Sequence, residues 1–398
     1  MATKRISSFN SHNPATGEVA GAYPIMNAKQ VNEIVGHARN ASVQWQKLGF
    51  AGRKKVLLAW STLIIKRIDQ IAALVSLETG KPVGDAKLEV SIAVGHIGWA
   101  ARHAEEIMRT AHRAPGLLLS NMSATVQRSP LGVVGVIGPW NYPIFTPVGS
   151  IVYALAAGNT VVFKPSEYTP GVGMWLEESF NEVAPFADVL TTITGLGETG
   201  GALCTSGVDK ISFTGSTRTA KIVAAQCATT MTPVVLECGG KDPVIVAADA
   251  NLERAVDATI WSAMANAGQS CIGAERVYVD EKVADVFIAK AVALAESIHA
   301  GAPGDGNYGP ATMPSQISVI SSHIKAAIKD GGQFAYGSLK SVQAPFVQPV
   351  ILVDVPESSA AVREETFGPI IIINRVANMQ EAIVLSNASS YGLGANVW

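Results

Sequence analysis

Residues 133–170 read VVGVIGPWNYPIFTPVGSIVYALAAGNTVVFKPSEYTP, and this stretch decides the fold. Two short runs rich in β-branched residues, Val133–Ile137 and Thr160–Phe163, flank an apolar segment near 144–157 that has the length of a helix. Strands that alternate with crossover helices predict a doubly wound parallel sheet. Ligands of such sheets bind at the carboxyl ends of the strands, so the turns that follow these two runs are the first candidates for a binding site.

The same alternation extends in both directions from this stretch. Downstream we expect further strands at Val189–Ile193, Lys210–Phe213 and Val234–Leu236, with helices near 171–183, 197–204 and 216–228. A second α/β set follows, with strands near 243–246, 275–279, 348–352 and 370–374 and helices near 251–266, 282–299 and 315–329. Upstream, helical periodicity runs from Ala28 to Arg109, with Asn27 as a predicted N-cap and helices at 53–65 and near 85–108. The sequence therefore predicts two α/β domains that meet near Gly239-Gly240.

The composition narrows the class of protein. The chain has 398 residues, of which 48% are hydrophobic and 16% charged, which favours two domains over one. A net charge of -2, a pI near 6.4 and scattered basic residues argue against nucleic acid as a partner. Met1 to Ser11 have no apolar signal core, and the apolar stretches are interrupted before they reach the length of a membrane span. We therefore expect a soluble, cytoplasmic protein with no membrane partner.

Four cysteines stand at 204, 227, 238 and 271, with spacings typical of neither a zinc site nor a redox pair. They indicate reduced thiols and no bound metal. Cys271, in the run GQSCIG at 268–273, follows a predicted helix and is surrounded by small residues. A free thiol has a pKa near ~8.5, so a nucleophilic role requires a helix end or a base that lowers this value. For an isolated cysteine, a buried structural role is the more common alternative.

Two further motifs carry groups suited to catalysis. Glu237 lies in LECGGK at 236–241, where a carboxylate at the end of an apolar strand is costly unless it is solvated, paired or used. Burial would raise its pKa, which suits a general base; an ion pair with Lys241 is the alternative. Asn141 lies in PWNYP at 139–143, and its amide could donate to an oxyanion, although asparagine is also common in ordinary turns.

Signals for a nucleotide are present without the usual fingerprint, since no GxGxxG follows the first strand. Instead FTGS at 213–216 closes a strand and opens a helix, which offers N–H groups and a hydroxyl to a pyrophosphate. Lys164 and Glu167 offer a cation and a carboxylate at another strand end. A carboxylate that accepts from both ribose hydroxyls disfavours a 2′-phosphate, so NAD is favoured over NADP.

Together these motifs resemble those of the aldehyde dehydrogenase superfamily, and the resemblance extends from about Asn13 to Trp398. The chain carries six of them in order and at family spacing: GPWNYP at 138–143, KPSEYTP at 164–170, FTGS at 213–216, LECGGK at 236–241, GQSC at 268–271 and EETFGP at 364–369. The resemblance implies a Rossmann-like parallel-sheet cofactor domain, a second α/β catalytic domain and a small bridging hairpin. It also implies NAD as cofactor, with NADP possible, a small-molecule aldehyde as substrate, and a homodimer or homotetramer.

The resemblance implies a role for each matching residue. Cys271 corresponds to the nucleophile that forms a thiohemiacetal, Asn141 to the donor that holds the oxyanion with the Cys271 N–H, and Glu237 to the base that activates the hydrolytic water. The residues that would contact the cofactor are Trp140, Lys164, Ser166, Glu167, Gly215, Ser216, Glu365 and Phe367. Those that would line the aldehyde tunnel include Tyr142, Phe145, Ser270 and Ile272.

The same resemblance implies the domain plan. Residues 1–117 and 133–238 would form the cofactor-binding domain, 118–132 the bridging or oligomerisation hairpin, and 239–398 the catalytic domain. Family members continue for several dozen residues after the position of Trp398, so we expect a truncated catalytic domain without the C-terminal strand that pairs with a partner. The run SATVQRS at 123–129 has the alternation of an exposed strand, which fits either an oligomerisation hairpin or an ordinary connecting strand.

Oxidation of an aldehyde to a carboxylate is the function that this sequence favours. One alternative is a truncated, catalytically impaired paralogue that binds nucleotide or acts as an assembly partner. Another is an acylating dehydrogenase that uses coenzyme A, although Glu237 argues for hydrolysis; a Cys–His hydrolase has weaker support, since no signature ties a histidine to Cys271. No cation stands at Gly149 or Ser150, which argues against a carboxylated substrate and favours an apolar or aromatic aldehyde.

Overall fold

The computed structural model describes residues 7–398, which divide into two compact units. Of the described residues, unit 1 holds 7–11, 21–74 and 87–237, and unit 2 holds 12–20, 75–86 and 238–398. Residues 1–6, the start of the polar N-terminal stretch, lie outside the described residues. No helix within 7–398 combines the length and the apolar content needed to cross a bilayer.

Unit 1 is built on a parallel sheet of five strands in the order β7-β6-β5-β8-β9. The strands are β5 (Val133–Ile137), β6 (Thr160–Lys164), β7 (Leu190–Thr192), β8 (Lys210–Thr214) and β9 (Val234–Glu237). Every residue of β5 and β6 is buried, as expected for central strands that are covered on both faces. The chain starts in the middle and turns outward twice, so the order reverses between β5 and β8. The carboxyl ends of these two strands flank the crevice in which doubly wound sheets bind ligands.

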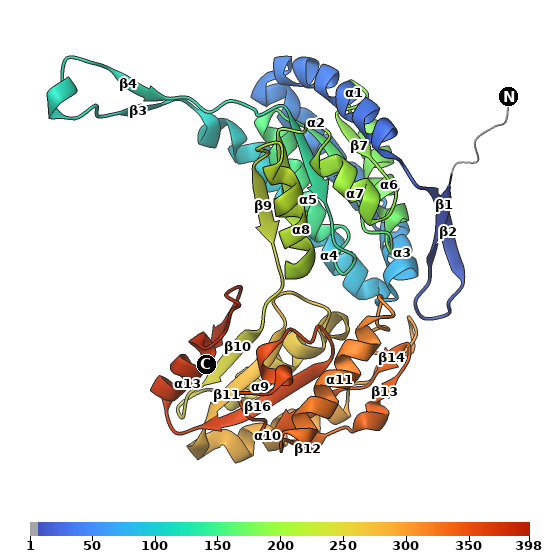
Figure 1. Cartoon of the computed structure of the whole chain (residues 1–398), viewed down its shortest axis with the longest axis vertical. Helices are drawn as coiled ribbons and strands as arrows, with labels where there is room; N and C mark the ends of the chain where they lie inside the picture. Colours follow the sequence, from blue (N-terminus) through green and yellow to red (C-terminus); the bar gives the residue numbers. More distant parts are fainter. Residues whose placement is uncertain (1–6) are drawn as a thin grey trace. The chain divides into compact units, whose positions relative to one another are not determined.

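The first eight helices of the chain either precede this sheet in sequence (α1–α4) or connect its strands (α5–α8) (Figure 1). They are α1 (Ala28–Lys47), α2 (Gly49–Lys66), α3 (Ile68–Thr79), α4 (Val83–Met108), α5 (Phe145–Ala157), α6 (Pro170–Asn181), α7 (Gly197–Cys204) and α8 (Thr217–Ala228). The predicted N-cap of α1 is confirmed: the Asn27 side chain accepts from the Gln30 N–H at 3.1 Å, and the Gln30 side chain accepts from the Asn27 N–H at 3.0 Å. The buried indoles of Trp45 and Trp60 each form a T-shaped contact with the Phe180 ring, which ties α1 and α2 to α6.

Two short segments pack differently from the predicted domain plan. Residues 12–20 and 75–86, which the plan assigns to the cofactor-binding domain, belong to unit 2. The Thr312 hydroxyl donates to the Thr79 carbonyl at 2.8 Å. A Cβ on Gly80 would lie 2.5 Å from the Pro310 ring and 3.0 Å from Pro14. This close packing, which a linear division of the sequence does not capture, places the end of α3 and the start of α4 in unit 2.

Two hairpins flank the helices of the N-terminal half. One consists of β1 (Ser8–His12) and β2 (Val19–Pro24). The other pairs β3 (Ala111–Arg113) with β4 (Ala124–Val126), joined through the 3₁₀ turn η1 (Leu117–Leu119), and extends from the rest of unit 1 (Figure 1). The predicted bounds of 118–132 were therefore too narrow, because the first strand precedes Gly116. At the tip, Leu117 and Leu118 are 91% and 96% exposed.

Unit 2 contains a six-stranded sheet in the order β12-β15-β16-β11-β10-β17, in which only β12 runs antiparallel to its neighbour. The strands are β10 (Asp242–Val246), β11 (Ala274–Asp280), β12 (Gln333–Tyr336), β15 (Val350–Val353), β16 (Ile370–Val376) and β17 (Asn396–Val397). A small hairpin is formed by β13 (Val342–Gln343) and β14 (Phe346–Val347) after the 3₁₀ turn η3 (Leu339–Ser341). The helices are α9 (Leu252–Met264), α10 (Glu281–Glu296), α11 (Gln316–Lys329), α12 (Ala360–Arg363) and α13 (Met379–Asn387).

Alternate residues of these strands face different helices, as the two-residue period of a strand requires. Val277 and Val279 of β11 join the core cluster that contains Phe287 of α10, whereas Tyr278 faces a smaller cluster with Ala382 of α13. Ile372 of β16 packs in a third cluster with α11. The sheet of unit 2 is therefore covered on both faces.

The helix predicted near 251–266 ends at Met264 instead. Ala265 is extended, and the 3₁₀ segment η2 (Ala265–Gly268) contains three consecutive residues with positive φ: Asn266 at 53°, Ala267 at 58° and Gly268 at 68°. Residues other than glycine rarely adopt this conformation, and each costs about 1–2 kcal/mol. Periodicity alone predicts a continuing helix, because the conformation is imposed by packing around the turn.

Candidate active site

The turn after β5 carries Asn141, which therefore lies just beyond the carboxyl end of that strand in unit 1. Asn141 is 6% exposed, and the α5 helix begins shortly after it. The carboxylate of Glu89, which is 2% exposed on α4, accepts from the N–H groups of Ile144 at 2.8 Å and Phe145 at 3.1 Å. A buried carboxylate at a helix N-terminus satisfies two donors that the helix leaves unpaired. Glu89 thus holds the backbone of the turn at the start of α5. In the sequence, the acidic residue within the largely apolar run LEVSIAV was the signal that could have identified Glu89.

The turn after β8 fits an anion. Ser216 is the N-cap of α8, its hydroxyl accepts from the Thr219 N–H at 3.3 Å, and it is exposed. The Gly215 N–H donates to the Glu237 carbonyl at 3.1 Å, and Thr214 pairs with Glu237 in the sheet. A helix N-terminus after a tight turn presents N–H groups that suit a pyrophosphate. The structure therefore brings Glu237 next to the predicted phosphate turn within unit 1.

The turn after β6 carries a fixed cation and a partly exposed carboxylate. Lys164 is 5% exposed, and its Nζ lies 3.5 Å from Oε2 of Glu167, whose side chain is 40% exposed. Burial lowers the pKa of Lys164, and the Glu167 carboxylate counteracts this effect. The Ser166 hydroxyl also lies 3.5 Å from Glu167 Oε2 and accepts from the Tyr168 N–H at 3.3 Å. These groups could hold the hydroxyls of a ribose.

In unit 2, Cys271 lies in the short loop between η2 and β11 and is half-buried. A Cβ on Gly240 would lie 2.7 Å from the Cys271 carbonyl oxygen. The glycine turn of the LECGGK motif, just before β10, therefore packs directly against the loop that carries Cys271. Side-chain to backbone hydrogen bonds hold the left-handed turn before it: Asn266 donates to the Gln269 carbonyl at 3.1 Å, and Gln269 donates to the Asn266 carbonyl at 2.9 Å. The position of Cys271 is thereby fixed by contacts on both sides.

Glu365, in the EETFGP loop, contacts the same glycine turn before β10. Its Oε1 accepts from the Gly240 N–H at 3.3 Å, and a Cβ on Gly239 would overlap the Glu365 carboxylate. Burial raises the pKa of Glu365 to about 7, and the nearby Glu275 carboxylate contributes in the same direction. Three motifs that are distant in sequence, those of Gly240, Cys271 and Glu365, thus converge within unit 2.

Within unit 2, Lys241 forms an ion pair with Glu275. Lys241 and Glu275 are 1% and 5% exposed. Burial lowers the pKa of Lys241, and the Glu275 carboxylate opposes that shift. Glu275 was missed in the sequence, although a carboxylate within the strand AERVYVD was a signal of the same kind as Glu237.

The remaining predicted residues lie as follows. Trp140, Tyr142 and Phe145 are half-buried around the start of α5 in unit 1, and the Phe145 ring centroid lies 5.3 Å from that of His96. Ser270 and Ile272 flank Cys271 in unit 2, and Ile272 is 58% exposed.

The other cysteines differ from Cys271 in their surroundings. Cys204 and Cys227 are fully buried in unit 1, and burial raises the pKa of Cys204 to about 12. A buried thiol of this kind is a poor nucleophile at neutral pH. None of the four cysteines takes part in a disulfide bond. Within residues 7–398, no group of three or more His, Cys, Asp or Glu side chains is arranged to hold a metal ion.

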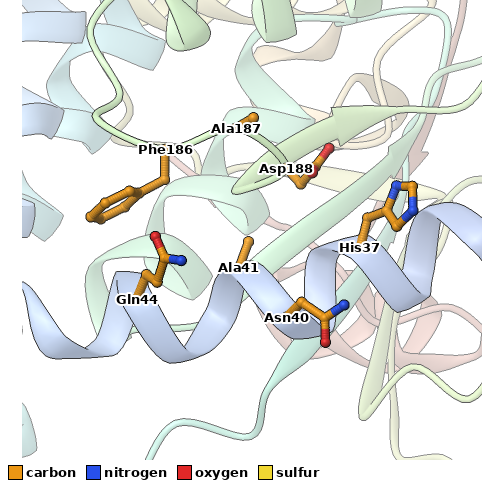
Figure 2. A pocket seen from close by; sticks show the side chains of 7 residues that line it. All are labelled: His37, Asn40, Ala41, Gln44, Phe186, Ala187 and Asp188. Carbon is orange, nitrogen blue, oxygen red and sulfur yellow. The ribbon is translucent and has the colours of Figure 1, made fainter.

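A hollow of about 400 Å³ lies elsewhere on unit 1, between α1 and the segment before β7 (Figure 2). It is lined by His37, Asn40, Ala41, Gln44, Phe186, Ala187 and Asp188. None of the predicted catalytic, cofactor or substrate residues belongs to this lining. The hollow is therefore separate from the motifs that carry the chemistry.

Comparisons with known proteins agree with these motifs. The sequence model described as "Aldehyde dehydrogenase family" matches residues 1–398. The chain is 37% identical over 387 residues to glutarate-semialdehyde dehydrogenase of Pseudomonas putida, covering 96% of this chain and 80% of the relative. It is 34% identical over 391 residues to the NADP(+) succinate-semialdehyde dehydrogenase of Escherichia coli, covering 96% and 80%. A crystal structure of an aldehyde dehydrogenase from Brucella melitensis biovar abortus 2308 superimposes with a TM-score of 0.94 at 33% identity, covering 98% of this chain and 81% of that one. The predicted α/β fold is thereby confirmed, and the chain belongs to the aldehyde dehydrogenase family.

Proposed function

We propose that this member of an aldehyde-oxidising family converts its aldehyde to the carboxylate through a covalent intermediate on Cys271, with Glu237 as the base. The convergence of Gly240, Cys271 and Glu365 within unit 2 carries the proposal. It brings the loop that carries Cys271, and a carboxylate that the family resemblance assigns to the nicotinamide ribose, to the same glycine. In unit 1, the pairing of Glu237 with Thr214 supports the proposed role of Glu237 as the base, because it places this residue next to the phosphate turn.

The chemical steps follow from the functional groups of the chain. The Cys271 Sγ attacks the carbonyl carbon, and the resulting oxyanion accepts hydrogen bonds from the Asn141 side-chain amide and the Cys271 N–H. A bound nicotinamide cofactor would supply the acceptor for the aldehyde hydrogen and its electron pair. The acyl group then remains on Sγ as a thioester. Glu237 removes a proton from water, the water oxygen attacks the thioester carbon, and the carboxylate product leaves as Sγ is released.

The cofactor site is proposed from groups in both units that fit such a molecule. In unit 1 the N-terminus of α8 suits the pyrophosphate, and the buried Lys164 with Glu167 suits the adenosine ribose. The full proposed set is Trp140, Lys164, Ser166, Glu167, Gly215, Ser216, Glu365 and Phe367. The family uses NAD or NADP. We favour NAD for this chain, because the Glu167 carboxylate would repel a 2′-phosphate.

The aldehyde is proposed to contact Tyr142, Phe145, Ser270 and Ile272. Three of these side chains, those of Tyr142, Phe145 and Ile272, are aromatic or aliphatic, which suits an apolar or aromatic aldehyde. The two relatives named above act on semialdehydes, according to their names, and so define the competing substrate class. Gly149 and Ser150 supply no cation for a second carboxylate, which supports the apolar class.

The larger organisation is proposed on the same basis. Unit 1 would bind most of the cofactor, and unit 2 would supply the nucleophile. The β3–β4 hairpin, with its exposed leucines at the tip, would associate with further copies of the chain in a homodimer or homotetramer. We also propose a cytoplasmic location.

Steady-state assays with aliphatic, aromatic and semialdehyde substrates, each with NAD+ and NADP+, test the function. We expect reduced cofactor and the carboxylic acid in equal amounts, without any need for coenzyme A, and no turnover by Cys271→Ala. Cys238→Ala is the matched control, because Cys238 is also half-buried and has no proposed role. Full activity of Cys271→Ala, or a requirement for coenzyme A, would refute the proposed mechanism.

A further inference from the structure

Glu275 occupies a position that neither the motifs nor the proposed chemistry explains. It lies at the start of β11, four residues after Cys271, and is 5% exposed. A buried carboxylate is unfavourable unless it is paired and hydrogen-bonded. The bonds that Glu275 makes therefore indicate what it is for.

The Glu275 carboxylate binds two consecutive backbone N–H groups of the EETFGP loop. The Thr366 N–H lies 2.8 Å from Oε2 and 3.1 Å from Oε1, and the Phe367 N–H donates to Oε1 at 2.8 Å. Phe367 has a φ of 51°, a left-handed conformation that is strained for an aromatic residue. Hydrogen bonds to a carboxylate are about twice as strong as those between neutral groups, so this clamp can hold the strained conformation.

Lys241 provides the opposing charge and a second attachment to the same loop. Its ammonium group pairs with Glu275 and donates to the Thr366 hydroxyl at 3.1 Å. The Thr366 hydroxyl also lies 3.1 Å from Nδ1 of His323, and the Thr366 carbonyl accepts from the Gln316 side chain at 2.6 Å. Thr366 is thus held through its N–H, its hydroxyl and its carbonyl.

We propose that Glu275, paired with Lys241, is a positioning residue that holds the backbone of Thr366 and Phe367 and thereby sets Glu365 and Phe367 against the cofactor. The inference rests on the proposed function, in which Glu365 and Phe367 grip the nicotinamide ribose and ring. One buried ion pair then joins three motifs: LECGGK through Lys241, the segment after GQSC through Glu275, and EETFGP through Thr366. Glu275 itself touches neither substrate nor cofactor in this proposal.

The double variant Lys241→Met/Glu275→Leu tests the proposal, because it removes both charges and leaves no unpaired buried ion. The matched control is Lys290→Met/Glu253→Leu, which makes the same changes at an ion pair on α9 and α10 where Glu253 is 75% exposed. We expect the KM for NAD+ to rise about 10-fold or more in the first variant, with the aldehyde KM changed less than about twofold. The control should keep both KM values.

A purely structural role would lower the melting temperature and leave the cofactor KM of the folded enzyme unchanged, and that result would overturn the proposal. If the double variant does not fold, Glu275→Gln is measured in the same assay, since it retains one acceptor oxygen; an unchanged cofactor KM again overturns the proposal. Hydrogen exchange of the native enzyme provides a reading without any variant. We expect slow exchange at the Thr366 and Phe367 amides, and exchange as fast as in an open loop would contradict the clamp.

These outcomes separate the inference from the proposed function. Absence of turnover by the native enzyme with every aldehyde and both cofactors would count against the function itself. Normal turnover by the native enzyme, together with an unchanged cofactor KM in the folded variant, would count against the role of Glu275 alone.

Discussion

Gly268 and Gly368 lie backbone against backbone: a Cβ on Gly268 would overlap the carbonyl carbon and oxygen of Gly368. Gly268 precedes Cys271 by three residues, and Gly368 directly follows Phe367. The loop of the proposed nucleophile and the loop of the proposed ribose grip therefore fit together only because Gly268 carries no side chain at this point.

Gly268→Ala should damage both loops at once. The new methyl group meets backbone atoms that cannot move aside, and φ at this position is +68°. We expect a loss of about 3 kcal/mol or more in the free energy of unfolding, together with most of the activity. Gly17→Ala is the control, because Gly17 has a φ of +77° with nothing within 4 Å of the added Cβ; it should lose only about 1–2 kcal/mol. Equal losses in chemical denaturation would show that the contact with Gly368 is unimportant.

Glu237→Gln should separate the two halves of the reaction. The thiol can still attack the aldehyde, but no base removes the proton of the hydrolytic water. Stopped-flow absorbance should show one burst of reduced cofactor per active site, followed by a steady rate lowered about 10²–10⁴-fold, and mass spectrometry should find the acyl group on Cys271. Glu198→Gln, at an exposed site on α7, should behave like the native enzyme. A native steady rate in Glu237→Gln would mean that another group is the base.

The raised pKa of Glu365 predicts a pH dependence of cofactor binding. Burial raises this pKa to about 7 from its ordinary value of 4.5. Below about pH 7 the group binds a proton and loses an acceptor for a ribose hydroxyl, so the cofactor KM should rise as the pH falls. Glu365→Gln should have a higher KM with a flatter profile. A slope that persists unchanged in Glu365→Gln would assign it to another group.

The same shift has a consequence for stability. Because the folded pKa lies above the unfolded one, the native state binds more protons between pH 4.5 and about 7, and the stability contributed by protonation is lost as the pH rises through that range. Glu365→Gln has no titratable group at this position, so its stability does not fall with rising pH for this reason. Its melting temperature relative to the native protein should therefore increase from about pH 5 to about pH 8. A constant difference would show that the carboxylate is not buried as described.

The cofactor preference should depend on Glu167. Replacing it with serine removes the carboxylate that would repel a 2′-phosphate and leaves the Lys164 cation in place. We expect the ratio of kcat/KM for NADP+ to that for NAD+ to rise about 10-fold in Glu167→Ser. Glu178→Ser, an exposed change on α6, is the control. An unchanged ratio would place the adenosine ribose elsewhere.

The exposed tip of the β3–β4 hairpin should control assembly. Leu117→Ser/Leu118→Ser removes two almost fully exposed apolar side chains, and we expect sedimentation velocity to show a shift from oligomer toward monomer. Met231→Ser is the control, because Met231 is 88% exposed at a different site of unit 1. A sedimentation profile equal to that of the native protein would mean that the hairpin tip is not the contact.

Much of the fold follows from local patterns. The buried β-branched runs of β5 and β6 and the cap at Asn27 are visible in the sequence, because each depends on residues a few positions apart. The end of α9 at Met264 is not visible in the sequence, since the left-handed turn after it is held by a hydrogen bond from Gln269 to the Asn266 carbonyl and packs through Gly268 on the distant backbone of Gly368. The strands β12 and β17 were also missed, because short runs at the edges of a sheet carry little periodicity.

Some residues of the candidate site could likewise be predicted from the sequence and others could not. Residues that stand in recognisable motifs, such as Cys271 and Glu365, were named from the sequence. The supporting carboxylates of Glu89 and Glu275 were not, because a buried acidic residue is explained only by its partners, and those partners lie 55 and 91 residues away along the chain.

The leucines of η1 also affect how the protein behaves on dilution. The proposed association hides apolar surface from water, and its extent is governed by mass action, so the fraction of assembled subunits falls as the sample is diluted. A kinetic assay at trace enzyme and a melting curve at high concentration would then report on different populations. Comparisons between variants are meaningful only when the amount of protein in the cuvette is held constant.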